Sequence, residues 1–147
     1  MKLDNFFKPK NIAVVGASRN ANKVGHQALK NSLETHKGKV FAINPNADEI
    51  LGLKCYKSIK TIKEKIDLVL LALPAKIVLK AVKEINKKGV KDIIIYAAGF
   101  KEIGNNKLEE QLKNYLKKHK IRALGVNCMG TYDAYSPLDT IFNPSYK

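Results

Sequence analysis

Cysteine is scarce in this sequence. Cys55 and Cys128 lie far apart and do not form a C-x-x-C pair. No group of cysteine, histidine and carboxylate residues has the spacing that metal ligands require. We therefore expect no disulfide and no metal site, and each cysteine is expected to be a free thiol that packs as a small apolar side chain.

Long apolar runs are also missing. No stretch approaches the roughly 18 residues that a membrane-spanning helix needs. The first residues, MKLDNFFK, lack the apolar core and the cleavage site of a signal peptide. These absences predict a cytoplasmic protein with no membrane partner. With 147 residues, 45% of them hydrophobic, the chain is expected to form one domain with a substantial core.

Arginine is rare in a strongly basic chain. Lysine and arginine together number 27 against 13 acidic residues, a formal net charge of +14, but only Arg19 and Arg122 are arginines. A basic surface attracts polyanions such as nucleic acid. Arginine, however, is the residue that best forms bidentate hydrogen bonds with phosphate or guanine. We therefore favour a solvated, lysine-rich surface and keep a nucleic-acid-binding domain as an alternative.

Short apolar strands alternate with amphipathic helices along most of the chain. The expected strands are 11–15, 39–43, 67–73, 91–96 and 121–124, and the expected helices are 24–36, 58–65, 75–88 and 107–119. Residues 48–56 are expected to be irregular, with room for one helical turn. The alternation predicts a Rossmann-like α/β fold, a doubly wound parallel sheet flanked by helices in a single domain. Such folds bind ligands at the carboxyl ends of the strands.

Residues 12–25 carry the strongest local signal. They read IAVVGASRNANKVG, an apolar strand that ends at Gly16 and a polar loop that leads into a helix near Val24 or Gly25. A strand that turns through glycine into a helix directs unpaired backbone N–H groups and the positive end of the helix dipole at one point. This geometry predicts an anion site, typically for the phosphates of a nucleotide-like ligand.

Two common nucleotide sites do not fit this loop. An NAD site needs G-x-G-x-x-G and an acidic residue after the second strand. Here Ser18 occupies the second glycine position, and Asn44 and Pro45 follow the second strand. A Walker-type loop is excluded because no G-K-S/T sequence follows a glycine-rich loop. An NAD-binding Rossmann domain therefore stays only as a less favoured alternative.

The strand ends offer no catalytic pair. They are rich in small residues and amides, and no acid and base lie at a spacing that indicates proton transfer. Glu102, Glu109 and Glu110 are expected to be solvated helix charges, and Cys128 is expected to be a buried thiol and not a nucleophile. We therefore expect no catalytic residue in this chain.

Seven short motifs occur in order along the chain, namely VVGAS, KVG, INPN, ILGLKCY, LPAK, AAGFKE and GVNCMG. Together they closely resemble the CoA-binding domain of ADP-forming acetate–CoA ligases (NDP-forming acyl-CoA synthetases). That domain is similar to the N-terminal domain of the succinyl-CoA synthetase alpha subunit. The resemblance covers about residues 6–144. It implies a domain that binds CoA or acyl-CoA in an enzyme that interconverts acyl-CoA, ADP and phosphate with carboxylate, CoA and ATP.

The resemblance also implies which residues contact CoA. The phosphates would lie at the first loop, the adenosine after the second strand, and the pantetheine arm beside the small residues after the fourth strand. The implied contacts are Gly16, Ala17, Ser18, Lys23, Val24 and Gly25 for the phosphates; Asn44 and Pro45 for the adenosine or its phosphate; Pro74 and Ile77 for an apolar wall; Tyr96, Ala97, Ala98 and Gly99 for the arm; and Asn127 and Cys128 near the thiol.

Several positions depart from the related sequences. Asn46 and Ala47 stand where succinyl-CoA-forming relatives carry a lysine, Ala98 replaces their acidic residue, and Val126 replaces the usual proline of the last motif. The departures at Asn46–Ala47 and at Ala98 favour the acetate-type branch.

The resemblance further implies partners beyond this chain. The phosphohistidine and the ATP-grasp site would lie in other domains or another subunit, and residues 126–147 would lead toward a second domain absent from this chain. The chain alone is therefore not expected to turn over. The alternative from a different class is a stand-alone CoA-binding module without catalysis.

Overall fold

A mostly parallel sheet organises the computed structural model, which describes residues 3–143. Its strands are β1 (Asn11–Val15), β2 (Lys39–Ile43), β3 (Glu49–Ile50), β4 (Leu53–Tyr56), β5 (Leu68–Leu71), β6 (Asp92–Ile95) and β7 (Arg122–Leu124). The strand order is β3-β4-β2-β1-β5-β6-β7, so β1 is central. Residues 144–147, which end the predicted tail and include the last residue of the resemblance, lie outside the described residues.

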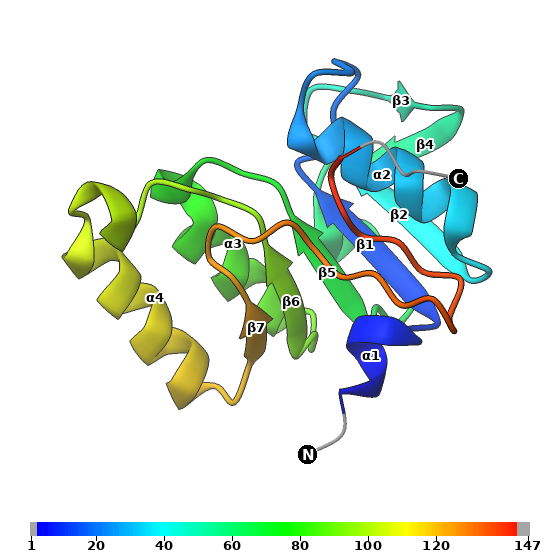
Figure 1. Cartoon of the computed structure of the whole chain (residues 1–147). Helices are drawn as coiled ribbons and strands as arrows, with labels where there is room; N and C mark the ends of the chain where they lie inside the picture. The colour runs from blue at the N-terminus through cyan, green and yellow to red at the C-terminus, as the bar shows by residue number, and fades with distance from the viewer. Residues whose placement is uncertain (1–2, 144–147) are drawn as a thin grey trace.

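Helices cover both faces of the sheet. They are α1 (Asp4–Phe7), α2 (Val24–Thr35), α3 (Ala75–Lys87) and α4 (Asn106–Lys118), with single 3-10 turns η1 (Ile59–Thr61) and η2 (Lys101–Ile103). Figure 1 shows α1, α2 and the C-terminal segment over one face, and α3 and α4 over the other. The predicted doubly wound α/β fold is therefore confirmed. No helix within residues 3–143 is long and apolar enough to cross a membrane.

The strands are apolar on both faces because both faces are buried. In β1, Ala13 packs with α3 and α4, whereas Ile12 and Val14 pack with α2. In β6, Ile94 lies on the α2 side and its neighbours Ile93 and Ile95 on the α3 side. The alternation follows from the two-residue period of a strand. The result is a pair of cores that hold the carboxyl ends of the strands at one edge.

The structure differs from the sequence prediction at residues 48–56. This segment is not irregular but an antiparallel hairpin, in which Glu49 pairs with Lys54. Its second strand, β4, also pairs in parallel with β2, with Ala42 opposite Cys55. A two-residue strand is too short to show a period in sequence, and long-range pairing with β2 stabilises the hairpin. The hairpin therefore adds two strands beyond β2.

The predicted helix at 58–65 is shorter than expected. Only η1 forms there, although its predicted cap is confirmed, since the Ser58 hydroxyl accepts a hydrogen bond from the Lys60 N–H at 3.3 Å. The other predicted helices and strands match the observed bounds to within two residues.

The chain after β7 is irregular, as predicted, but it returns across the sheet. Residues 129–143, here called the C-terminal segment, lie along the face that carries α2 (Figure 1). A bridge joins Tyr132 and Asp139, and the Phe142 N–H donates to the Met129 carbonyl at 3.2 Å. Leu138 is buried in the core on the α2 side. The C-terminal segment is therefore part of the folded domain.

Candidate functional site

A cavity of about 920 Å³ lies at the carboxyl ends of the parallel strands. Its walls come from the loops after β1, β2, β4, β5 and β6, from the start of α2 and from one face of α3. All predicted contact residues except Gly99 and Cys128 line it. These lining residues are Gly16, Ala17, Ser18, Lys23, Val24, Gly25, Asn44, Pro45, Pro74, Ile77, Tyr96, Ala97, Ala98 and Asn127.

The loop after β1 requires two glycines. Gly16 has φ +90°, a left-handed conformation that side chains disfavour, and a Cβ there would lie 2.2 Å from the Ala72 carbonyl oxygen. A Cβ on Gly25 would lie 1.9 Å from the Gly16 carbonyl oxygen. The first turn of α2 therefore packs directly on the loop backbone.

The N-terminus of α2 opens on the cavity. Lys23 is the N-cap residue, and its side chain makes no capping hydrogen bond. Among residues 3–143, the backbone N–H groups of Val24 and Gly25 have no hydrogen-bond partner. His26 ties the helix to the loop, because its Nδ1 lies 2.8 Å from the Ser18 carbonyl oxygen. Unpaired N–H groups, a helix dipole and an ammonium group together favour an anion here.

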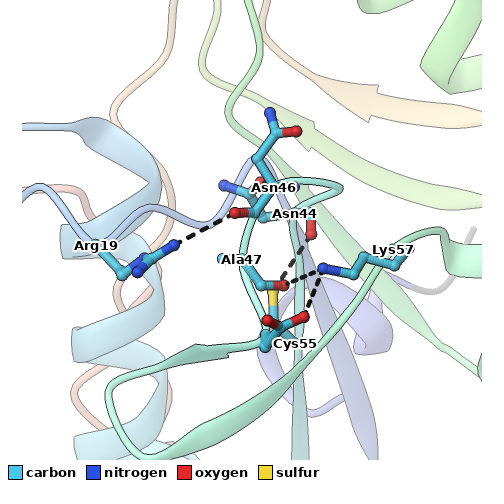
Figure 2. Close-up of polar contacts among 7 residues, drawn as sticks. Arg19, Asn44, Asn46, Ala47, Cys55 and Lys57 are labelled. Carbon is cyan, nitrogen blue, oxygen red and sulfur yellow. Dashed lines mark hydrogen bonds and ion pairs between the residues drawn. The ribbon is translucent and has the colours of Figure 1, made fainter.

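Asn44 joins the second strand end to the first loop. Its side-chain NH2 donates to the Ala17 carbonyl at 2.8 Å, and its Oδ1 accepts from the Asn46 N–H at 2.8 Å. The Cys55 thiol lies beneath it, 3.8 Å from the Asn44 carbonyl oxygen. Figure 2 shows the contact between Cys55 and Asn44. The side chain therefore shapes the wall of the cavity between the β1 and β2 loops.

Cations flank the segment that follows Asn44. The Arg19 guanidinium donates to the Asn46 carbonyl at 3.3 Å. The Lys57 ammonium donates to the Ala47 carbonyl at 3.0 Å and to the Asp48 carboxylate at 2.7 Å (Figure 2). The Lys57 contact lowers the pKa of the Asp48 carboxyl. Lys57 lines the cavity and therefore brings a cation to this corner.

Glu102 organises the loop after β6. Its carboxylate accepts the Gly99 N–H at 2.5 Å and the Phe100 N–H at 3.1 Å, and Asn105 donates to the Gly99 carbonyl at 2.9 Å. These bonds, that of Gly99 above all, lower the pKa of Glu102. Glu102 is exposed, as expected of a solvated charge, but it also binds two backbone N–H groups. Both polar groups of Gly99 are engaged in this loop. Gly99 does not line the cavity, whereas Ala98 does.

The Cys128 thiol and the Tyr96 hydroxyl both contact backbone carbonyl groups. The Cys128 thiol lies 3.4 Å from the Ile95 carbonyl oxygen, and burial raises its pKa. Burial also raises the pKa of the Tyr96 hydroxyl, which donates to the Thr140 carbonyl at 2.5 Å. Cys128 therefore points to the strand and not into the cavity. The adjacent Asn127 lines the cavity and donates its N–H to Ala97.

Sequence reasoning missed several lining residues. Lys80, Ala81 and Glu84 follow Ile77 at helical spacing on α3, so the period of that helix was a signal for them. Lys57 depends on the unpredicted hairpin, which carries it to the strand-end edge. No local sequence pattern predicts that Phe142 lines the cavity, because it lies there only since the C-terminal segment runs back across the sheet. Within residues 3–143, no three metal-ligating side chains gather.

These features define a Rossmann-like domain with a cavity at the strand ends, onto which the N-terminus of α2 opens. The family can be named more narrowly, since the family described as "CoA binding domain" matches residues 10–134. The chain belongs to this family.

Two of the similar proteins are ADP-forming acetate–CoA ligases. The chain is 42% identical to an ADP-forming acetate–CoA ligase of Methanocaldococcus jannaschii over 91% of its own length and 19% of the ligase. It is 38% identical to the alpha subunit of the Pyrococcus furiosus ADP-forming acetate–CoA ligase II, over 95% of the chain and 31% of the subunit. The chain thus spans less than a third of each of these relatives.

A solved structure has the same fold. The dinucleotide-forming acetyl-coenzyme A synthetase 1 of Candidatus Korarchaeum cryptofilum, in complex with phosphate and ADP, superposes with a TM-score of 0.92 at 41% identity. The match covers 97% of this chain and 31% of the synthetase. These relatives support the hypothesis of a ligase domain over that of a stand-alone module.

Proposed function

We propose that this chain binds CoA or acyl-CoA in the cavity at the strand ends, as the CoA-binding domain of an ADP-forming acyl-CoA ligase. The observation that carries the proposal is the combination, in one cavity, of the unpaired N–H groups of α2 with a wall of small residues after β6. CoA needs both, because its phosphates are anions and its pantetheine arm is slender.

Among the lining residues that follow the strands, the lysines lie at one half of the cavity, and this arrangement orients the ligand. Lys23 and Lys57 follow β1 and β4, on one half of the sheet. Ala97, Ala98 and Asn127 follow β6 and β7, on the other half. In the proposed complex the phosphates and adenosine occupy the cationic half, and the arm runs across the alanines toward Asn127. Gly99 and Cys128 then support the wall from behind.

The complete ligase would interconvert acyl-CoA, ADP and phosphate with carboxylate, CoA and ATP in the cytoplasm. The length of the relatives supports further domains or a further subunit. In this proposal those parts carry the phosphohistidine and the ATP-grasp site, and residues 126–147 lead toward them. The role of this chain is to hold CoA and present its sulfur, without a catalytic residue of its own.

Calorimetric titration of the 147-residue chain with CoA, acetyl-CoA and NAD tests the proposal. We expect saturable CoA binding, no NAD binding, and an affinity for CoA that falls about fivefold or more in Ser18→Ala and Lys23→Ala. Lys30→Ala is the matched control, because Lys30 is an exposed lysine of the same helix outside the cavity. Binding of NAD without CoA, or of neither, contradicts the proposal.

A further inference from the structure

Phe142 reaches the cavity from outside the strand-end loops. It belongs to the C-terminal segment, yet it lines the cavity together with Tyr96. The two rings meet edge to face, with their centroids 5.8 Å apart and their planes at 87°. Such an edge-to-face contact favours one relative orientation of the two rings. An apolar ring therefore forms part of the wall at the β6 side of the cavity.

A buried asparagine of α2 holds the backbone on both sides of Phe142. The side-chain NH2 of Asn31 donates to the Ile141 carbonyl and to the Asn143 carbonyl, each at 2.7 Å. Its Oδ1 accepts from the Gln27 side chain at 2.8 Å, so both donors remain directed at the C-terminal segment. Asn31 is 1% exposed. Both N–H groups are thus used in a dry environment, where losing a partner is costly.

Further contacts hold the segment at neighbouring points. The Asp139 N–H donates to the Thr35 hydroxyl at 2.9 Å, one turn beyond Asn31 on α2. The Tyr96 hydroxyl donates to the Thr140 carbonyl at 2.5 Å. The C-terminal segment is therefore attached to α2, whose N-terminus forms the anion site, and to the end of β6, which borders the alanine wall.

We propose that Phe142 is a binding residue for the apolar part of the pantetheine arm, and that Asn31 is the residue that positions it. This inference rests on the proposed function. Asn31 does not line the cavity, so it acts through the two carbonyls that flank Phe142. The ring covers the methyl and methylene groups of the arm, while the anion site at α2 holds the phosphates independently.

The test compares two ligands on the full chain. CoA contains the arm, whereas adenosine 3′,5′-bisphosphate carries the phosphoadenosine end without it. Phe142→Ala is expected to weaken CoA binding about tenfold and to leave adenosine 3′,5′-bisphosphate binding unchanged. Phe142→Leu keeps an apolar side chain and is expected to recover much of the affinity. Phe7→Ala is the control, since Phe7 is another partly buried phenylalanine of the same core outside the cavity.

Asn31→Asp tests the positioning role. The substitution replaces the two N–H donors with a carboxylate that faces two carbonyl oxygens, so the segment is expected to shift and CoA binding to weaken. In the Phe142→Ala background, Asn31→Asp should weaken CoA binding no further, because the ring that it positions is gone. If Asn31 had only a structural role, Asn31→Asp would weaken CoA binding by the same factor in both backgrounds. It would also weaken the binding of CoA and of adenosine 3′,5′-bisphosphate equally.

The outcomes separate this inference from the proposed function. If the native chain does not bind CoA, the proposed function fails and the inference fails with it. If the native chain binds CoA and Phe142→Ala binds it equally well, the inference alone is overturned. Equal weakening of CoA and adenosine 3′,5′-bisphosphate by Phe142→Ala also overturns it, because the effect then lies in the fold and not in the arm.

Discussion

The Glu102 carboxylate accepts the backbone N–H of Gly99 at 2.5 Å, behind the loop that forms the alanine wall of the cavity. The same carboxylate also accepts the Phe100 N–H at 3.1 Å, so it binds two consecutive backbone N–H groups. The loop conformation therefore depends on a side chain that is itself exposed and does not line the cavity. An ionised acceptor makes stronger bonds to N–H groups than a neutral one.

We predict that Glu102→Gln lowers the thermal midpoint of the chain at pH 7 and that this difference disappears in acid. The pKa of Glu102 is lower in the folded chain than its ordinary value of 4.5. The stability that its ionised form contributes is therefore fully present above that ordinary value and is lost as the pH falls through the folded-state pKa. Thermal melts of both proteins from pH 7 into acid measure the difference. A difference that persists undiminished in acid contradicts the prediction.

Gly25→Ala is expected to destabilise the chain although alanine is the better helix former. Alanine gains about 1 kcal/mol of helix propensity over glycine. The new Cβ, however, would lie 1.9 Å from the Gly16 carbonyl oxygen, and such overpacking typically costs about 1–3 kcal/mol. The overlap outweighs the propensity and also displaces the anion loop. Urea unfolding and CoA titration should therefore both show losses, with affinity reduced on the order of tenfold.

Gly38→Ala is the matched control for that experiment. A Cβ on Gly38 would also lie 1.9 Å from a carbonyl oxygen, that of Lys10, but Gly38 is not part of the cavity. It should lose stability and keep its affinity for CoA. Equal loss of affinity in the two variants would show that destabilisation alone explains the effect of Gly25→Ala.

Most of the fold could be predicted because the central strands are buried on both faces. Such strands read as continuous apolar runs, as in Leu68–Leu71, and the helices between them show a clear period. The β3–β4 hairpin could not be predicted in the same way. Its strands are short, and β4 is held by pairing with β2, which is a long-range contact with no trace in the local sequence.

The residues of the candidate site likewise fall into those that local sequence predicts and those that depend on long-range contacts. Residues that follow a strand directly, such as Ser18, Asn44 and Ala97, could be placed at the cavity from the topology alone. Lys57 and Phe142 could not be placed in this way. The β3–β4 hairpin positions Lys57, and the return of the C-terminal segment across the sheet positions Phe142. The sequence predicted that Glu102 is charged but not that it holds the loop. The loop conformation positions the Gly99 and Phe100 N–H groups that it binds.

Arg122→Ala is predicted to be among the most destabilising exchanges of a charged residue. Arg122 donates to both oxygens of Asp92 at 2.5 and 2.7 Å, and the Asp92 side chain is 2% exposed. Removing the guanidinium leaves a buried carboxylate with one remaining side-chain donor, Asn5, which costs on the order of 3 kcal/mol. Urea unfolding measures this loss.

Lys65→Ala provides the contrast for Arg122. The Lys65 ammonium lies 3.4 Å from the Asp67 carboxylate, but the lysine side chain is 87% exposed. Asp67 is 11% exposed but also accepts the Lys10 and Asn11 N–H groups, so losing a lysine that is itself in solvent is expected to cost less than about 1 kcal/mol. Equal losses in the two variants would contradict the assignment of the Arg122–Asp92 pair as a buried anchor.

Lys57→Gln is expected to weaken CoA binding about threefold to tenfold. Lys57 is paired with Asp48, but that carboxylate is 96% exposed. Such an ion pair is weak, so the Lys57 ammonium can bind a phosphate instead. Lys54→Gln removes the same charge from β4, at a side chain that lies over the Tyr56 ring and outside the cavity. The overall attraction of CoA to a chain of net charge +14 falls equally in both variants.

A difference between these two variants therefore isolates a local contact. Calorimetric titration should show weaker CoA binding in Lys57→Gln than in Lys54→Gln, and the gap should narrow at high salt, which screens exposed charges. Dephospho-CoA, which lacks the phosphate on the ribose, identifies the partner of Lys57. If Lys57 contacts that phosphate, the two variants bind dephospho-CoA equally. If both variants bind CoA equally, Lys57 only closes the β4 corner of the cavity, and the phosphates depend on the α2 N-terminus and Lys23.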